Sequence, residues 1–224
     1  MSANSIVDNL VQSAGTVLTV TVKSAMANES SFWVLYGQHT KPTYLEDAGN
    51  GQQLQRDAAL KYIKQWRVCL DIGSNIGQWT RPLSSKFESV VCFEPNPNFR
   101  ECFNKNVNEN NVLLWPIGLS DKEHTAKQGF NSTVLQNEEG DIDCRTLDSF
   151  ALTNVDFVKI DVDGFEVPLL NGARETLTKN NPVINIEMKR DKRNNITQKC
   201  ESILKELGYT FQKRTKSDEV WLKS

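Results

Sequence analysis

The chain has 224 residues, a formal net charge of −2 at pH 7 and 38% hydrophobic residues, which fits one globular α/β domain with additions. The charge balance provides no basic field for a phosphate backbone, so nucleic acid is disfavoured as a partner. No apolar run approaches the roughly 20 residues that a membrane span needs.

Five cysteines are scattered along the chain, and none belongs to a C-x-x-C pair. This odd number and spacing favour neither a zinc knuckle nor a disulfide framework. Free thiols persist in reducing compartments, so we expect a cytoplasmic protein.

The first 52 residues are predicted to form an N-terminal extension to a domain that covers 53–224. Residues 16–22 alternate threonine with apolar side chains, which is typical of a strand, and 31–37 form a second short apolar run. This extension is a candidate lid over a ligand site or a segment that pairs with a second copy in a homodimer. Helical spacing of apolar residues follows at 54–66.

From residue 67 onward, apolar strands alternate with helical patterns, apart from an irregular insertion at 119–154. The alternation predicts βαβ units and a mostly parallel sheet. A closing hairpin is expected in "YTFQKRT" and "DEVWLKS". The five expected parallel strands are "RVCLDI", "SVVCFEP", "VLLWPIG", "VDFVKIDVDG" and "PVINIEM", and the expected helices are 78–87, 97–110, 165–180 and 196–208.

Acidic residues stand at the ends of four of these strands. They are Asp71, Glu94, Asp161 and Glu187. Ligands of parallel sheets bind outside the carboxyl ends of the strands, so these side chains are the first candidates for a site.

The loop after the first parallel strand reads "DIGSNIG". It has no Lys after Gly77, which excludes a Walker phosphate loop, and its spacing is not the G-x-G-x-x-G of dinucleotide folds, so NAD is disfavoured. The carboxylate of Asp71 suits a ligand with a cationic end. S-adenosylmethionine carries an ammonium and a sulfonium and has no phosphate.

Glu94 follows about 20 residues later, at the position where an acidic residue of a nucleoside-binding sheet accepts hydrogen bonds from ribose hydroxyls. Adenosine with a cationic tail satisfies both this residue and the glycine loop. The alternative is purely structural, with Asp71 as a helix cap and Glu94 as a surface acid. The two acids at successive strand ends, with glycines between them, favour the nucleoside.

Several stretches occur in the order seen in one known family. They are "VCLDIGSNIGQWT", "VVCFEPNPNF", "LLWPIGLSD", "TLDSF", "VDFVKIDVDGFEVPLLNGA" and "PVINIE". Over roughly 67–189 the chain resembles the FkbM family of S-adenosylmethionine-dependent methyltransferases. The resemblance implies a class I methyltransferase fold, which is Rossmann-like, with a seven-stranded sheet and a C-terminal antiparallel hairpin.

The resemblance also implies a set of cofactor contacts. They are Asp71, Gly73, Ser74, Asn75, Gly77, Glu94, Pro95, Gly118, Leu119, Ser120 and Asp161. Family members usually have Glu at the position of Asp163, so the charge is kept here with a shorter reach.

Methyl transfer to a hydroxyl requires alignment of the reacting atoms and removal of a proton. The candidate bases are Asp161, Asp163 and Glu187, which the predicted sheet brings near the expected methyl group. Such a cluster could also hold Mg²⁺, but we favour a reaction without a metal.

The resemblance implies a hydroxyl on a sugar, a glycan or a small metabolite as the acceptor, and S-adenosylhomocysteine as the product. Two alternatives stay open at this point. The chain could methylate a protein or a nucleic acid, or it could bind S-adenosylmethionine without turnover.

Overall fold

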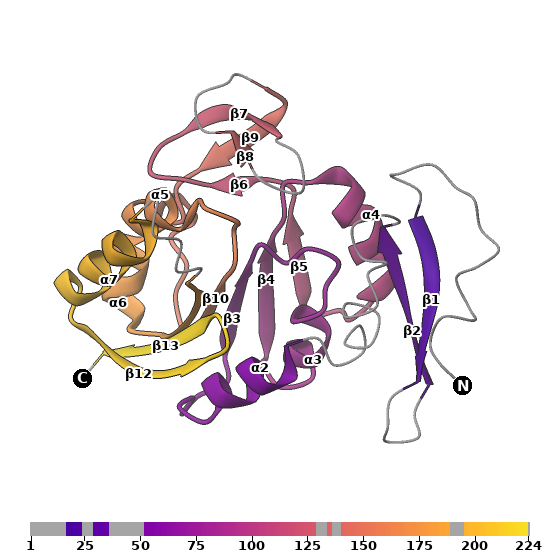
Figure 1. Cartoon of the computed structure of the whole chain (residues 1–224), viewed down its shortest axis with the longest axis horizontal. Coiled ribbons are helices and arrows are strands. Elements are labelled where there is room, and N and C mark those ends of the chain that lie inside the picture. Colours follow the sequence, from indigo (N-terminus) through magenta and orange to yellow (C-terminus); the bar gives the residue numbers. More distant parts are fainter. Residues whose placement is uncertain are drawn as a thin grey trace.

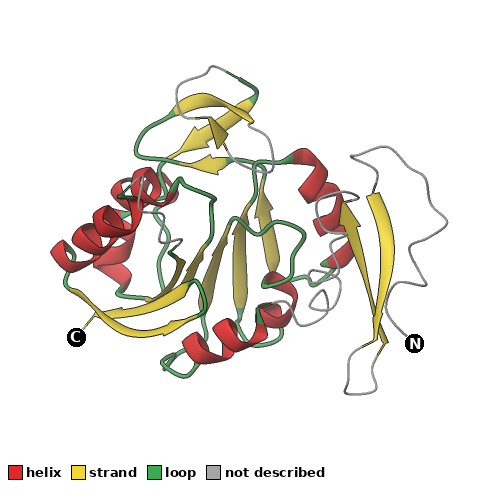
Figure 2. Ribbon diagram, in the orientation of Figure 1, coloured by secondary structure: helices red, strands yellow, loops and turns green. Residues whose placement is uncertain are grey.

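The computed structural model describes residues 17–23, 29–35, 52–128, 134–135, 140–188 and 195–223. A seven-stranded sheet runs through the centre, with helices on both faces and two smaller β-structures at its margins (Figures 1 and 2). Its strands are β3 (Val68–Ile72), β4 (Ser89–Phe93), β5 (Val112–Trp115), β10 (Val155–Ile160), β11 (Val183–Glu187), β12 (Tyr209–Thr215) and β13 (Asp218–Lys223).

The spatial order of the strands is β12-β13-β11-β10-β3-β4-β5. The five strands from β11 to β5 are parallel, whereas β13 pairs antiparallel with both β11 and β12. The last strand of the chain is therefore inserted between β11 and the edge strand β12. This topology confirms the predicted mostly parallel seven-stranded sheet with a C-terminal antiparallel hairpin.

The two faces of the sheet bury different clusters. Leu70 and Ile160 belong to an apolar cluster covered by three helices, and Cys69 and Phe157 belong to a second cluster on the opposite face. The covering helices of the first face are α5 (Glu166–Asn171), α6 (Arg174–Asn180) and α7 (Ile196–Glu206), and those that contribute to the second are α2 (Gln53–Leu60), α3 (Thr80–Ser84) and α4 (Pro97–Asn106). None of the helices in the described part of the chain combines the length and the apolar character needed to cross a bilayer.

All five predicted helices are longer than the observed ones: α3 covers only part of the predicted 78–87, and α4 and α7 end before residues 110 and 208. The helix predicted at 54–66 ends at Leu60, where the amides of Tyr62 and Ile63 turn back onto carbonyls three residues earlier. The helix predicted at 165–180 is broken into α5 and α6 at Gly172. A Cβ atom at Gly172 would lie 1.9 Å from the carbonyl oxygen of Ser120, so a tertiary contact restricts this position between the two helices to glycine.

The insertion at 119–154 was predicted to be irregular, and this is wrong for its described part. It forms a small sheet with the order β6-β9-β7-β8, which stands beyond the carboxyl end of β5 (Figure 1). Pro116 separates β5 from β6 and cannot donate a ladder hydrogen bond, so the chain leaves the main sheet there. The strands are β6 (Gly118–Leu119), β7 (His124–Gln128), β8 (Val134–Leu135) and β9 (Ile142–Arg145).

An N-terminal hairpin of β1 (Val17–Lys23) and β2 (Glu29–Leu35) lies against α4 at one edge of the molecule (Figure 1). Asn106, at the end of α4, accepts a hydrogen bond from the backbone N–H of Trp33 at 2.6 Å. Its amide donates to the carbonyl oxygens of Trp33 at 2.9 Å and of Ile76 at 2.8 Å. Because Ile76 belongs to the glycine loop, Asn106 ties the hairpin to that loop.

We expect Asn106→Ala to lower the free energy of unfolding by about 3 kcal/mol, because it leaves partly buried backbone groups of Trp33 and the buried carbonyl of Ile76 without partners. Urea denaturation followed by circular dichroism measures the change. Asn104→Ala, an exposed position on the same helix, is the control and is expected to have little effect. Equal destabilisation by the two variants would contradict the role assigned to Asn106.

Candidate functional site

One face of the sheet changes from apolar to polar toward its carboxyl end. In-register partners on parallel strands point to the same face, so Asp71 of β3, Lys159 of β10 and Asn185 of β11 form one row. The row below it contains Cys69 and Phe157 and is apolar. All three side chains of the polar row are buried, with at most 3% of each residue exposed.

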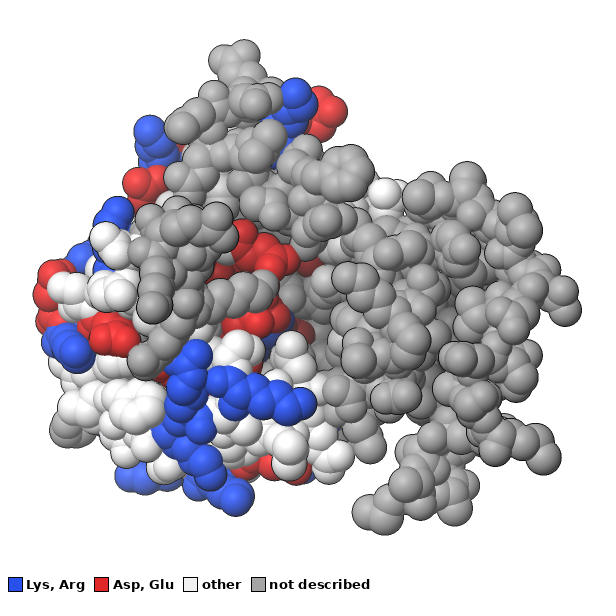
Figure 3. Space-filling view, in the orientation of Figure 1, with Lys and Arg blue, Asp and Glu red and all other residues white. Residues whose placement is uncertain are grey.

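The next row upward lies where the strands end. The ladder continues past the strands, because the N–H of Gly73 donates to the carbonyl of Phe93 at 2.9 Å and the N–H of Asp161 donates to that of Ile72 at 3.1 Å. This row brings together three of the acids predicted from the sequence, Glu94, Asp161 and Glu187. Acidic side chains also gather near the middle of the face drawn in Figure 3.

The glycine loop runs from Gly73 to Gly77, and both glycines have a positive φ, of 73° and 90°. The N–H groups of Gly73 and Ser74 both donate to the carbonyl oxygen of Phe93. The side-chain oxygens Ser74 Oγ and Asn75 Oδ1 are buried and have no hydrogen-bond partner among the described residues. Buried polar atoms normally have partners, so these two oxygens point to a ligand at the loop.

Glu94 is 5% exposed and joins the glycine loop to α4. Its Oε2 accepts a hydrogen bond from the N–H of Asn75 at 2.9 Å, and its Oε1 accepts one from the N–H of Asn96 at 2.8 Å. Burial raises the pKa of Glu94 to about 7, although these two hydrogen bonds and the charge of Lys159 oppose the shift. Each oxygen keeps further acceptor capacity, which suits a pair of ligand hydroxyls.

Asp71 does not present its carboxylate as the sequence suggested. The residue is 0% exposed, and its Oδ2 accepts a hydrogen bond from Thr80 Oγ1 at 2.6 Å. Its Oδ1 lies 3.3 Å from the Lys159 ammonium, and that ammonium donates to the carbonyl oxygen of Gly73 at 2.7 Å. Asp71 therefore acts on the loop through Lys159, from beneath it.

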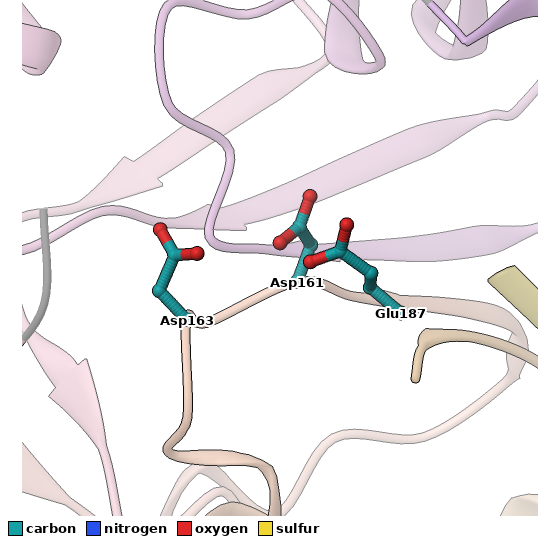
Figure 4. A group of neighbouring side chains, drawn as sticks. All are labelled: Asp161, Asp163 and Glu187. Carbon is teal, nitrogen blue, oxygen red and sulfur yellow. The ribbon is translucent and has the colours of Figure 1, made fainter. Parts of the chain in front are cut away.

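The three predicted catalytic acids do come together. Carboxylate oxygens of Asp161, Asp163 and Glu187 all lie within 4.8 Å of one another, and Figure 4 shows the three side chains as neighbours above the strand ends. Each residue is partly exposed. Carboxylates grouped in this way can orient a hydroxyl and accept its proton, which is the chemistry that a general base needs.

Asp218 is a member of this region that the sequence analysis missed. It begins β13 opposite Glu187, and its Oδ2 accepts a hydrogen bond from the Asn185 amide at 2.7 Å. Ser217 Oγ bridges to Glu187 and Asp218 at 3.2 Å each. Burial raises the pKa of Asp218, and the charge of Asp161 adds to this shift. Nothing local marks Asp218, because its position depends on β13 lying beside β11.

The other predicted contacts lie near these groups in the chain but play different parts. Pro95 is half-buried between Glu94 and Asn96. Gly118, Leu119 and Ser120 are buried in and just after β6, where the N–H of Ser120 donates to the carbonyl of Arg145 in β9. Contact of any of these residues with a cofactor stays a prediction.

Solved structures with the same fold include several methyltransferases. The FkbM methyltransferase of Methylobacillus flagellatus KT is 16% identical, with a TM-score of 0.54, and the match covers 80% of this chain but only 51% of that protein. TYW2 of M. jannaschii, solved in complex with AdoMet, is 15% identical, with a TM-score of 0.52 and 96% and 90% of the two chains covered. The precorrin-6y C5,15-methyltransferase of Geobacter metallireducens GS-15 is 15% identical, with a TM-score of 0.51 and 86% and 94% covered. At these identities the likeness establishes the fold.

The sequence itself decides the family. No protein with a curated description matches the chain in sequence. The family model of the methyltransferase FkbM domain matches residues 71–211, which is more than half of the chain and includes every acid of the candidate site except Asp218. The match begins near the end of β3 and ends within β12, and it agrees with the resemblance seen in the individual motifs. The chain belongs to the FkbM methyltransferase family.

Proposed function

We propose that this protein transfers a methyl group from S-adenosylmethionine to a hydroxyl of a sugar, a glycan or a small metabolite. The observation that carries the proposal is that three features lie together at the carboxyl ends of the parallel strands. They are the glycine loop, the buried Glu94 and the cluster of Asp161, Asp163 and Glu187. Family membership supports the reaction class, and the polar groups at the edge support the donor and the acceptor chemistry.

The residues of the loop fit this donor. Ser74 Oγ and Asn75 Oδ1 are buried and find no partner in the described part of the chain, and Glu94 has acceptor capacity for two ribose hydroxyls. Gly73 and Gly77 have positive φ angles, which residues with side chains rarely adopt. When bound, S-adenosylmethionine supplies a methyl group on a positively charged sulfur and leaves as S-adenosylhomocysteine.

The acids of the cluster orient the acceptor hydroxyl and take up its proton. A new oxygen–carbon bond forms as the sulfur–carbon bond breaks, and the hydroxyl proton passes to a carboxylate of the cluster. Asp161 is our first choice for this base, because its backbone touches the glycine loop at Gly73. Asp163 and Glu187 then orient the hydroxyl, and positioning of this kind supplies several kcal/mol of the acceleration.

The charge of the cluster also bears on the substrate. Three carboxylates within 4.8 Å repel a phosphate or carboxylate placed beside the reacting hydroxyl. The net charge of −2 likewise gives no general attraction to nucleic acid. Both features support an uncharged, hydroxyl-rich acceptor over RNA or DNA.

The same proposal extends to the setting of the protein. All five cysteines are buried free thiols, which supports a reducing, cytoplasmic compartment. We keep the domain division at residue 52, with the β1–β2 hairpin as part of the extension. Its role as a lid or as the contact of a homodimer stays a prediction, because 1–16, 24–28 and 36–51 lie outside the described residues.

We expect Asp161→Asn to lower turnover about 100-fold or more while S-adenosylmethionine still binds, since general bases contribute about 10²–10⁴-fold. Glu187→Gln is expected to act in the same direction with a smaller effect. Formation of S-adenosylhomocysteine is measured against a panel of sugars, polyols and phenols, with RNA and protein as rival acceptors. Isothermal titration calorimetry gives the affinity for S-adenosylmethionine.

Asp57→Asn is the matched control, because Asp57 is exposed on α2 and outside the acid cluster. The assay is repeated with EDTA, and loss of activity that Mg²⁺ restores would contradict a reaction without a metal. Turnover by Asp161→Asn at the wild-type rate would show that Asp161 is not the general base. If the wild-type protein gives no heat with S-adenosylmethionine, the proposed function fails.

A further inference from the structure

Lys159 is a lysine in the interior of the central sheet. Among the described residues, only Lys159 and Arg56 are buried Lys or Arg side chains. Lys159 is 3% exposed and lies on β10, between Asp71 of β3 and Asn185 of β11. A charged group in such a place needs close partners, because transfer of a charge out of water is strongly unfavourable.

Its partners belong to the glycine loop and to the strand that leads into it. The ammonium donates to the carbonyl oxygen of Gly73 at 2.7 Å, and it lies 3.3 Å from Oδ1 of Asp71. Burial alone would lower the pKa of Lys159, but the nearby carboxylates of Asp71, Asp161 and Asp218 raise it. The group is therefore a cation with a fixed position beneath the loop.

The contact at Gly73 has consequences for the whole loop. The N–H of Gly73 is held by Phe93 of β4, while its carbonyl oxygen is held by Lys159 of β10. Both sides of this residue are thus fixed by strands on opposite sides of β3. Asp71 in turn is held by Thr80, at the start of α3, at 2.6 Å. These contacts connect the loop to three strands and the following helix.

We propose that Lys159 is a positioning residue that holds the glycine loop in the shape that binds the methyl donor, by fixing the Gly73 carbonyl from inside the sheet. The inference rests on the proposed function, since it concerns the same site. A lysine that only balances the charge of Asp71 would be dispensable once that charge is removed. If Lys159 positions the loop, its removal should weaken binding of the methyl donor even when Asp71 has been neutralised.

The test removes both charges at once. The double variant Asp71→Asn/Lys159→Met removes both members of the Asp71–Lys159 ion pair, and the new amide can still accept the hydrogen bond from Thr80. We expect it to fold, as measured by circular dichroism and urea denaturation, and to bind S-adenosylmethionine about tenfold more weakly or worse, the loss of one hydrogen bond from a charged donor. Asp71→Asn/Lys159→Gln, which restores a neutral donor toward Gly73, is expected to recover part of this affinity.

Lys179→Met is the control, because Lys179 is exposed and its ion pair with Glu175 lies at the surface. Binding by Asp71→Asn/Lys159→Met within twofold of the wild type would overturn the inference and leave the proposed function intact. Absence of binding by the wild type would instead sink the proposed function.

A measurement on the wild-type protein covers the case in which the double variant does not fold. In protein labelled with ¹⁵N-lysine, the ammonium protons of Lys159 are expected to exchange slowly with water, and their resonance is expected to shift when S-adenosylmethionine is added. Rapid exchange, or a resonance that the donor leaves unchanged, would contradict the inference.

Discussion

Gly73→Ala is expected to abolish measurable binding of S-adenosylmethionine and to destabilise the fold severely. Gly73 has a φ of +73°, and a Cβ atom there would lie 1.8 Å from the carbonyl oxygen of Asp161 and 2.9 Å from its carbonyl carbon. That oxygen belongs to backbone just after β10 and cannot rotate away. The end of β10 would have to separate from β3, so we expect a loss of about 4 kcal/mol or more in the free energy of unfolding.

Gly164→Ala separates the effect of the positive φ from the effect of the clash with Asp161. Gly164 also has a positive φ, of +105°, but a Cβ atom there would meet nothing within 4 Å. It should therefore show only the conformational penalty of about 1 kcal/mol. Urea denaturation of both variants gives the comparison, and calorimetry gives the binding. A Gly73→Ala protein no less stable than Gly164→Ala would disprove the close contact.

The affinity for S-adenosylmethionine is expected to rise about tenfold between pH 6 and pH 8, with release of a proton on binding. The pKa of Glu94 is raised to about 7 by burial, so the carboxyl is largely protonated at pH 6 in the free protein. In the proposed complex, two ribose hydroxyls of S-adenosylmethionine donate hydrogen bonds to Glu94 and favour its charged form, so binding must expel the proton at the lower pH. Calorimetry at pH 6, 7 and 8, in buffers of different ionisation enthalpy, measures both quantities.

The same pKa also sets the sign of an effect on stability. The folded protein retains a proton on Glu94 that the unfolded chain releases at its ordinary pKa of 4.5. The contribution of Glu94 to the free energy of unfolding therefore falls as the pH rises from about 4.5 to about 7. Bound S-adenosylmethionine should weaken this trend, because it lowers the pKa of Glu94 toward its ordinary value.

Glu94→Gln should weaken binding about 100-fold and remove its pH dependence, because the amide loses acceptors for hydroxyls and places a donor against the N–H of Asn75 or Asn96. Glu88→Gln is the matched control, since Glu88 is exposed and precedes β4, at the opposite end of the strand from Glu94. A wild-type affinity that is constant from pH 6 to pH 8 would refute the assignment.

The central part of the fold was predictable because its signals are local. The apolar runs of β3, β4, β10 and β11 and the closing hairpin each appear in the sequence, and their alternation with helices defines the parallel sheet. The errors in the predicted secondary structure lie where contacts between residues distant in the sequence determine the local conformation. The helix after β10 is interrupted at Gly172, where the backbone of Ser120 leaves no room for a Cβ atom, and β9 of the insertion pairs with β6.

The candidate site shows the same division. Glu94, Asp161 and Glu187 were expected at one edge because the carboxyl ends of parallel strands meet there, and the structure brings them together. Asp71 was expected to face a ligand, but its carboxylate is buried against Lys159. Asp218 could not be found, since its place depends on the order of the last two strands. Whether each residue serves the proposed function stays a prediction.

The contact between Lys159 and Gly73 joins two residues that are 86 positions apart. During synthesis the complete glycine motif and Glu94 emerge long before the strand that holds them. Contacts of such sequence separation form late and slow the folding of a chain. A nascent chain shorter than about 160 residues would carry the glycine motif without a complete site, and the ability to bind S-adenosylmethionine would appear when β10 joins β3 at the centre of the sheet.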